Sequence, residues 1–292
     1  MISLYICIYI VLLLNYPQSQ GSEPESMKPT VNILGIDVGG SHITAALLHH
    51  TEQGWLTKCS TRMLLDASSP AGNIISTIQT GITTLVTQTD SAIDTLGIAF
   101  PGPFDYEKGV SSIAGVGGKF ESLFGLHLQQ AIRDTPGLQH ATVKFSNDAH
   151  CFAAGAYQLL GLNSKRTVFI TLGTGFGSAF LVNGNLVQAG AGIPPSGAFY
   201  DQDFEGAKAD DLFSTRWILH AYQVKTGHTI DSVKALVETE PEAAMAVMSA
   251  FGNKLGQFLL PWLESFQCDE LVIGGNIAKA FSLFAPSLNN AL

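Results

Sequence analysis

The sequence contains few positively charged residues. Of its 292 residues, 15 are Lys or Arg and 24 are Asp or Glu, which gives a formal net charge of −9. Nucleic-acid binding depends mainly on clustered Lys and Arg that contact the phosphate backbone, so this balance disfavours a DNA-binding protein. Charged residues make up only 13% of the chain and hydrophobic residues 46%, which excludes a disordered chain and favours a globular protein with a large core.

Cysteines are sparse as well. The four cysteines, Cys7, Cys59, Cys151 and Cys268, are scattered along the chain and form no C-x-x-C pair. Neither a disulfide framework nor a zinc knuckle is therefore indicated. This pattern is typical of buried thiols in a reducing compartment.

The sequence also lacks an apolar run long enough to cross a membrane. The apolar segment 1–14 is shorter than the ~20 residues that a membrane-spanning helix needs and is closer in length to the apolar part of a signal peptide. No Lys or Arg precedes Lys28, so the positive start of such a signal is missing. A poor signal or anchor and a true translation start at Met27 both stay open. Residues 1–26 are therefore left out of the expected fold, and no stable membrane association is expected.

From residue 30 onward, apolar strand-like runs alternate with helix-like stretches, which predicts an α/β fold. At about 100 to 200 residues per domain, the length suggests two domains or one large one. We expect two, at 27–146 and 147–292. Strands are expected at 31–37, 41–48, 54–65, 95–100, 141–145, 167–172, 178–182 and 270–273. Helices are expected at 73–87, 124–132, 149–160, 210–222, 241–266 and 277–284. Pro261 should kink or interrupt the helix that contains it.

Two glycine-rich turns join strand pairs in the two halves of the chain. The first glycine loop is residues 39–41 (Gly-Gly-Ser), and the second glycine loop is residues 173–177 (Gly-Thr-Gly-Phe-Gly). Exposed backbone N–H groups in such loops can cradle phosphate oxygens, although a structural turn explains either loop alone. Neither loop has the spacing of a P-loop or of a dinucleotide-binding fingerprint. Their similar positions favour a duplicated domain.

Three polar side chains near the expected strand ends could carry chemistry. Asp37 lies inside the apolar run VNILGIDVGG, where an unpaired carboxylate would be costly, so it should face a cation, a metal or a polar cleft, or else cap the glycine turn. Asn147 and Asp148 lie between a strand and a helix. They would meet a ligand at the carboxyl end of the sheet, but Asn and Asp are also the preferred N-cap residues of helices.

Taken together, five motifs resemble those of a known family. The motifs are GIDVGGSHI, GIAFPGP, Asn147-Asp148-Ala149, LGTGFGSAFLVNG and LVIGGNI, in that order. This order is similar to that of the ROK sugar kinases (repressor, open reading frame, kinase), a bacterial glucokinase-like group within the actin-like ATPase superfamily. The resemblance covers the chain from about residue 31. It implies a ribonuclease H-like fold of two domains, each a mixed five-stranded sheet flanked by helices, with a ligand cleft between them.

The resemblance also implies roles for individual residues. Asp148 would be the general base, Asn147 would bond a neighbouring sugar hydroxyl, and Asp37 would lie near Mg²⁺, with water between them. Phosphoryl transfer needs such a carboxylate together with phosphate-cradling donors. The implied ATP- and phosphate-binding residues are Asp37, Gly39, Gly40, Ser41, Gly173, Thr174, Gly175, Gly177, Gly274 and Gly275.

The chain departs from the family pattern after the second glycine loop. The family carries an E-x-G-H motif, whose Glu and His hold the sugar, and then a Cys-rich zinc loop, but this chain has AGAGIPPSGAFYDQDFEGAKADD instead. No zinc site is expected. Asp210 is the candidate sugar-binding acid, although it could equally cap a helix. Lys119 lies where the family has sugar-lining residues, but a solvated lysine is the favoured interpretation.

These observations predict a cytoplasmic kinase that uses ATP and Mg²⁺ to phosphorylate the 6-hydroxyl of a hexose, with glucose as the first guess. The alternative is a non-catalytic sugar-binding or regulatory protein of the same fold, because the E-x-G-H motif is missing. The retained glycine loops, Asp37 and Asp148 favour catalysis, since a binding module needs neither a base nor a phosphate cradle. The partners expected are a hexose, no nucleic acid and, as is common in the family, a second copy in a homodimer.

Overall fold

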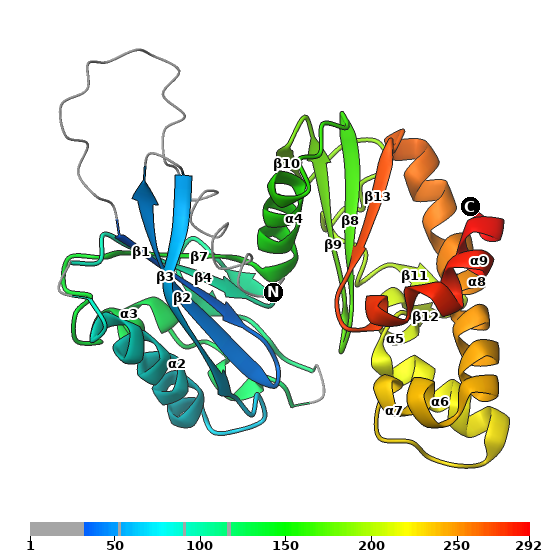
Figure 1. The fold of residues 1–292 in the computed structure, drawn as a ribbon, viewed down its shortest axis with the longest axis horizontal. Coiled ribbons are helices and arrows are strands. Elements are labelled where there is room, and N and C mark those ends of the chain that lie inside the picture. Colours follow the sequence, from blue (N-terminus) through cyan, green and yellow to red (C-terminus); the bar gives the residue numbers. More distant parts are fainter. Residues whose placement is uncertain (1–31, 52–53, 90–91, 116–117) are drawn as a thin grey trace. The chain divides into compact units, whose positions relative to one another are not determined.

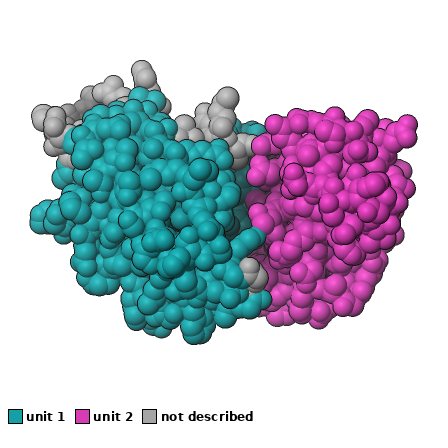
Figure 2. Space-filling model, turned by 90° about the horizontal axis from the view of Figure 1, so that it is seen from below, with its two compact units in different colours: residues 1–161 teal, residues 162–292 magenta. Residues whose placement is uncertain are grey.

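The computed structural model describes residues 32–51, 54–89, 92–115 and 118–292. The apolar leader, residues 1–26, and the alternative start at Met27 lie outside these ranges. The chain divides into two compact units, Met1–Gly161 and Leu162–Leu292 (Figure 2). The division falls after helix α4 (Asp148–Leu159), whereas we expected a domain boundary before it, because α4 contacts strands of the first unit.

The first unit is built on a five-stranded mixed sheet in the order β3-β2-β1-β4-β7 (Figure 1). Strands β1, β2 and β3 form an antiparallel meander, and β4 and β7 run parallel to β1. The strands are β1 (Asn32–Val38), β2 (His42–Thr51), β3 (Gly54–Leu64), β4 (Thr95–Phe100) and β7 (Thr142–Asn147), with a small separate pair of β5 (Phe104–Asp105) and β6 (Val110–Ser111).

Alternation along the strands explains how this sheet is covered. Leu34 and Ile36 of β1 are fully buried in a core shared with helices α2 (Ala71–Val86) and α3 (Leu128–Arg133). Ile33, which points the other way, is only 3% exposed, so β1 is buried on both faces. Helix α4 packs against β4 and β7 outside that core. Burial on both faces explains why these strands read as continuous apolar runs.

The second unit repeats this arrangement with one strand fewer. Its sheet has the order β10-β9-β8-β13, with β8 and β9 antiparallel and β13 parallel to β8, just as β4 is parallel to β1. The expectation of five strands in each sheet is therefore wrong for this unit, whose described sheet has no counterpart of β7. The strands are β8 (Arg166–Leu172), β9 (Phe176–Val182), β10 (Asn185–Val187) and β13 (Glu270–Gly274), beside a short pair of β11 (Asp203–Phe204) and β12 (Ala207–Lys208).

The helices differ from expectation at several places. Helix α7 (Val233–Thr239) was not expected, and the helix expected at 277–284 is a 3₁₀ turn followed by α9 (Phe281–Ala291). The helix expected at 210–222 is two helices, because Phe213 and Ser214 leave helical geometry between α5 and α6. The helix expected at 124–132 begins at residue 128, since Gly125 adopts a left-handed φ of 74°. Helix α8 continues through Pro261, held by buried residues on both sides of the proline. The remaining helices are α5 (Ala209–Leu212), α6 (Thr215–Thr226), α7 (Val233–Thr239), α8 (Pro241–Phe266) and α9 (Phe281–Ala291), with 3₁₀ turns at Glu121–Leu123 and Ile277–Ala280.

No helix among the residues that the structure describes has both the length and the apolar character needed to span a membrane.

Aromatic rings fill the core of the second unit. Phe176, at the start of β9, lies 5.2 Å from Phe213 between ring centroids, and Phe213 lies 5.0 Å from Phe258 of α8. Phe199 lies 5.4 Å from Phe258. Such tilted and edge-on pairs add to the stabilisation that burial provides. They anchor the second glycine loop, because Phe176 belongs to it.

The contact between α8 and α9 depends on glycine. A Cβ added at Gly252 would lie 2.3 Å from the backbone oxygen of Phe284 in α9. We therefore expect Gly252→Ala to lower the free energy of unfolding by about 1–3 kcal/mol, the usual range for an overpacked core. The measurement is urea denaturation beside Gly72→Ala, a control in α2 at which an added Cβ meets nothing within 4 Å. Equal unfolding midpoints for the two variants would contradict this packing.

Candidate functional site

The carboxyl ends of three parallel strands bring the motif residues of the first unit to one edge of the sheet. Asp37 of β1 pairs in register with Ala99 of β4, and Ala99 pairs with Ser146 of β7. Asp148 follows two residues after Ser146, as the first residue of α4. Two carboxylates from distant parts of the sequence are thereby collected at the edge where open α/β sheets bind ligands.

The electrostatics of Cys151 show that these carboxylates share one neighbourhood. Cys151 is fully buried in α4, and burial raises the pKa of its thiol far above the usual range. The charges of Asp148 and Asp37 raise this pKa further, while a hydrogen bond with Ser146 lowers it. The thiol therefore stays protonated at neutral pH, and Cys151 is a structural residue beside the two acids.

The two residues of the Asn147-Asp148 pair have different local roles. Asn147 is the N-cap of α4, because its Oδ1 accepts hydrogen bonds from the backbone N–H groups of Ala149 (3.0 Å) and His150 (3.2 Å). Its Nδ2 donates to the hydroxyl of Tyr106 at 3.0 Å, and Tyr106 donates to the carbonyl of Phe100 at 3.0 Å. The capping interpretation thus holds for Asn147. Sequence reasoning missed Tyr106, although it lies just after the GIAFPGP motif.

Asp148 is not needed for capping. Its Oδ1 accepts from the N–H of Ala149 at 2.9 Å. Part of the residue still reaches solvent, yet the protein packed around it is enough for burial to raise the pKa of its carboxyl, and backbone hydrogen bonds lower this pKa in part. Such a carboxylate accepts a proton more readily than an ordinary surface aspartate.

The first glycine loop is tied into the unit through backbone hydrogen bonds. Gly39 donates its N–H to the carbonyl of His42 at 2.9 Å, so this donor is engaged inside the β1–β2 hairpin. The carbonyl of Gly40 accepts from Ala67 N–H at 3.3 Å. Because the C=O and N–H of a trans peptide point in opposite directions, the N–H of Ser41 points away from Ala67. The Ser41 hydroxyl lies 3.1 Å from Nδ1 of His42.

Lys119 lies beside this loop, which the sequence did not indicate. A Cβ added at Gly40 would lie 3.9 Å from Cδ of Lys119. The segment that carries the lysine is fixed there because Phe120 donates its N–H to the carbonyl of Ala67 at 2.6 Å. The aliphatic stem of Lys119 therefore borders Gly40.

The second glycine loop is held by side chains that follow it in the sequence. The carbonyl of Gly173 accepts from both the N–H (2.8 Å) and the hydroxyl (3.0 Å) of Thr215. Phe176 donates its N–H to Oδ1 of Asp210 at 2.7 Å. Arg216 donates from Nη1 to the carbonyl of Thr174 at 3.4 Å. Sequence reasoning missed both Thr215 and Arg216.

Asp210, the expected sugar ligand, has both carboxylate oxygens engaged within the second unit. Oδ1 accepts from Phe176, and Oδ2 accepts from Nη2 of Arg216 at 2.8 Å. Arg216 also contacts Asp211 at 3.2 Å. The structure thus places Asp210 against the second glycine loop, and its contact with sugar stays a prediction.

The last glycine pair has a structural explanation of its own. Gly274 ends β13 and pairs with Thr171 of β8, which also pairs with Gly177 of the second loop. Gly275 has a φ of 91°, and a Cβ there would lie 2.2 Å from the carbonyl oxygen of Leu172. The backbone itself therefore requires glycine at 275. The approach of this pair to adenosine stays a prediction.

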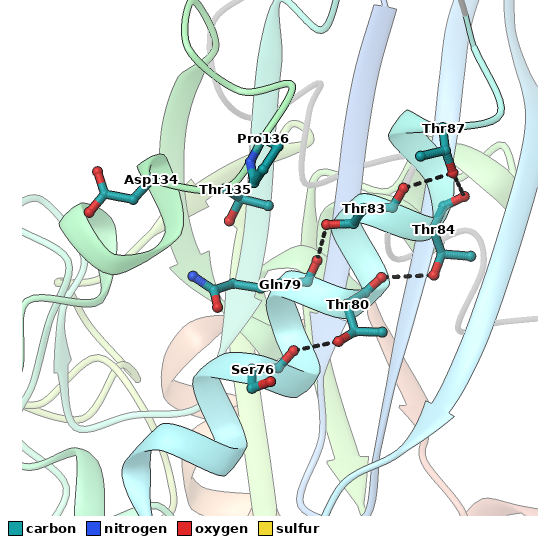
Figure 3. A pocket seen from close by; sticks show the side chains of 9 residues that line it. All are labelled: Ser76, Gln79, Thr80, Thr83, Thr84, Thr87, Asp134, Thr135 and Pro136. Atoms are coloured by element: carbon teal, nitrogen blue, oxygen red, sulfur yellow. Dashed lines mark hydrogen bonds between the residues drawn. The ribbon is translucent and has the colours of Figure 1, made fainter.

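A hollow of about 610 Å³ lies elsewhere on the first unit, between α2 and the segment after α3 (Figure 3). None of the motif residues lines it. The hydroxyl groups of Thr80, Thr83, Thr84 and Thr87 in this hollow each donate to a carbonyl one turn earlier in α2. Within the described ranges, no three His, Cys, Asp or Glu side chains are placed to hold one metal ion.

A model of the ROK family matches residues 33–292. This chain belongs to the ROK family. The resemblance inferred from the five motifs is confirmed, and so is the expected α/β fold of mixed sheets flanked by helices, which is that of the actin-like ATPases. No curated protein sequence matches the chain.

Solved structures of ROK proteins share the fold at low sequence identity. A ROK glucokinase from Streptomyces griseus, in complex with glucose and AMPPNP, has a TM-score of 0.68 at 18% identity, over 89% of this chain and 88% of that one. A ROK hexokinase from Thermus thermophilus has a TM-score of 0.68 at 14% identity, over 90% and 89%. A ROK transcriptional regulator, a homolog of the E. coli MLC protein, has a TM-score of 0.66 at 18% identity, over 89% and 69%. The ROK fold therefore serves both kinases and a regulator.

Alanine in the two glycine loops tests whether they receive phosphate. An added Cβ meets nothing closer than 3.9 Å at Gly40 and nothing within 4 Å at Gly173, and neither φ lies in the left-handed region. Both variants should therefore unfold like the parent chain. If phosphate approaches the backbone, the new methyl group occupies its space, and the Kd of Mg-ATP should rise about tenfold, or ~1.4 kcal/mol.

The measurement is titration calorimetry with Mg-ATP, beside urea denaturation. Gly72→Ala is the matched control, because it too adds a Cβ in open space but lies outside both loops. An unchanged Kd in both loop variants would remove the loops from the phosphate site.

Proposed function

We propose that this ROK protein is a kinase that transfers the γ-phosphate of ATP, with Mg²⁺, to the 6-hydroxyl of a hexose, with glucose as the first candidate. The observation that carries the proposal is the environment of Asp148. Its carboxyl has a raised pKa, and it lies at the same sheet edge as Asp37 and the first glycine loop. A protein that only binds sugar has no need for a partly buried proton acceptor there.

The proposed reaction has one proton transfer and one phosphoryl transfer. The carboxylate of Asp148 accepts the proton of the sugar hydroxyl, and the hydroxyl oxygen forms a bond to the γ-phosphorus. The bond from that phosphorus to the bridging oxygen breaks, and ADP leaves. A general base works best when its pKa approaches the working pH, so the burial that raises the pKa of Asp148 favours this step.

The hydrogen bonds around Asn147 support the proposed positioning of the substrates. Asn147 orients the sugar through a neighbouring hydroxyl, and its amide is prealigned by the helix cap and by Tyr106. Both glycine loops receive phosphate oxygens, and Gly274 and Gly275 approach the adenosine. The glucose and AMPPNP bound by the similar Streptomyces griseus glucokinase support both substrates.

Asp37 is suited to hold Mg²⁺. Mg²⁺ prefers oxygen ligands, keeps several of its waters and needs only one or two carboxylates when phosphates share it. Asp37 supplies one carboxylate at the strand end, and its negative charge reaches the interior as far as Cys151. Asp37 would hold the ion through water, and the ion would neutralise charge on the transferred phosphate.

The second candidate function is a non-catalytic sugar-binding or regulatory protein. Two observations favour it: the E-x-G-H motif is missing, and a ROK transcriptional regulator shares the fold. Hydroxyl recognition depends on specific hydrogen-bond partners, so loss of that motif bears on which sugar is bound. We also propose a cytoplasmic location, where ATP is supplied, and a homodimer.

Asp148→Asn tests the proposed base. The amide cannot accept the proton, so turnover should fall on the order of 10²- to 10⁴-fold, while hexose binding should persist. The measurement is ADP release by residues 27–292 with Mg-ATP and a panel of hexoses and N-acetylhexosamines. Asp134→Asn, an exposed acid after α3, is the control and should leave turnover unchanged. Near-normal turnover of Asp148→Asn would remove the base assignment, and hexose binding by the parent chain with no turnover would favour the second candidate.

The raised pKa of Asp148 also predicts a pH dependence of stability. The folded state holds this proton more tightly than the unfolded state. The stability from the protonated carboxyl is therefore complete below the unfolded pKa of about 3.9 and is lost as the pH rises through the higher folded pKa, where the carboxyl of the folded protein ionises. Asp148→Asn removes that ionisation. The variant should therefore be more stable than the parent at pH 7, and the difference should shrink toward pH 4. Urea denaturation at both pH values measures it, and a pH-independent difference would contradict the burial of this charge.

A further inference from the structure

The second glycine loop is built around one carboxylate. The N–H of Phe176 donates to Oδ1 of Asp210 at 2.7 Å, across 34 residues of sequence. A Cβ added at Gly175 would lie 2.8 Å from the same oxygen, so glycine at 175 is what lets the carboxylate come this close. Asp210 therefore fixes the middle of the loop from inside the unit.

The break between α5 and α6 places further residues against the second glycine loop. Ser214 has extended geometry, with φ −131° and ψ 169°, and α6 starts directly after it. As a result, Thr215 directs both its N–H and its hydroxyl to the carbonyl of Gly173. Arg216, one residue further, reaches the carbonyl of Thr174 and Oδ2 of Asp210. Two consecutive residues, Thr215 and Arg216, thus hold the carbonyls of two neighbouring loop residues, Gly173 and Thr174.

Charge explains why the arginine accompanies the aspartate. A carboxylate beside a loop that receives phosphate would repel the phosphate unless a cation offsets it. Arg216 provides that cation, and its planar guanidinium can bond the carboxylate and the loop carbonyl at once. The side chains of Arg216 and Asp210 are 49% and 33% exposed, and ion pairs in such positions add little to overall stability. The ion pair of Arg216 and Asp210 is therefore better explained by a role in holding the second glycine loop than by a contribution to the stability of the fold.

We propose that Asp210 and Arg216 are positioning residues that hold the second glycine loop in the conformation that binds the phosphates of a nucleoside triphosphate, and that Asp210 is not a sugar ligand. The proposal rests on the proposed function and adds a role within it. Asp210 orders the N–H groups of the loop, and Arg216 keeps the carboxylate neutralised.

The test compares binding of nucleotide and of sugar, each measured alone by titration calorimetry with AMPPNP and Mg²⁺ or with glucose. Asp210→Ala should raise the Kd of AMPPNP about tenfold and leave the Kd of glucose within about twofold. Asp210→Asn keeps an oxygen for the N–H of Phe176 and should have a smaller effect, which also provides a variant if the alanine form does not fold. Arg216→Gln should weaken AMPPNP binding, and Arg216→Lys should restore part of it.

Asp211→Asn is the matched control, because Asp211 contacts Arg216 but not the loop. It should bind AMPPNP and glucose like the parent chain. A raised Kd of glucose with an unchanged Kd of AMPPNP would make Asp210 a sugar ligand and overturn the proposal. Unchanged affinity for both ligands in Asp210→Ala would overturn it as well.

Hydrogen exchange separates failure of this proposal from failure of the proposed function. Without any ligand, the backbone amides of residues 173–177 should exchange faster in Asp210→Ala than in the parent chain. If Asp210→Ala exchanges faster than the parent chain but the parent chain itself binds no AMPPNP, the kinase is rejected and the loop-positioning role is kept. Unchanged exchange together with normal AMPPNP binding would reject the positioning role and keep the kinase.

Discussion

Partial burial of the Asp148 carboxylate at the sheet edge is the constraint to which the rest of the first unit conforms. The strand before it must end at Asn147, so that the helix can start with the acid as its first residue. Asn147 makes that start possible because it takes the two N–H groups that an uncapped helix would leave unpaired. Tyr106 then fixes the amide from the other side. The cap and the candidate base are one device, in which the first residue positions the second.

The two units use the same strand order around their glycine loops but brace those loops differently. In the first unit the backbone does this work, since Ala67 bonds the carbonyl of Gly40 and the Lys119 segment is tied to Ala67 in turn. In the second unit the side chains of Asp210, Thr215 and Arg216 supply most of the bracing, beside one backbone bond from Thr215 to Gly173. Backbone bracing tolerates substitution nearby, whereas side-chain bracing makes loop geometry depend on charge. Although the two units share a strand order, their glycine loops can therefore differ in function.

The strand positions and the order of the motifs could be predicted from the sequence because they depend on local patterns. The runs around Asp37 and Gly173 are buried on both faces, and such strands read as continuous apolar segments. The break at Ser214 could not be predicted, because the periodicity of 210–222 is helical, whereas the bond from Thr215 to Gly173 beside the break joins residues far apart in the sequence. The position of Lys119 beside Gly40 could not be predicted either, because it depends on a hydrogen bond between Phe120 and Ala67, which are far apart in the sequence.

The capping and catalytic interpretations of the Asn147-Asp148 pair are not alternatives. A helix N-terminus favours a negative charge, and the N–H of Ala149 lowers the pKa of Asp148, yet burial outweighs both and leaves that pKa raised. A carboxylate placed only for capping would be better off in water, where the same N–H groups are available without the loss of solvation. Partial burial destabilises the ionised carboxylate and thereby lowers the stability of the fold. The same effect raises the proton affinity of the carboxylate, which a general base requires. Partial burial at the start of α4 therefore supplies the raised proton affinity that the proposed base needs.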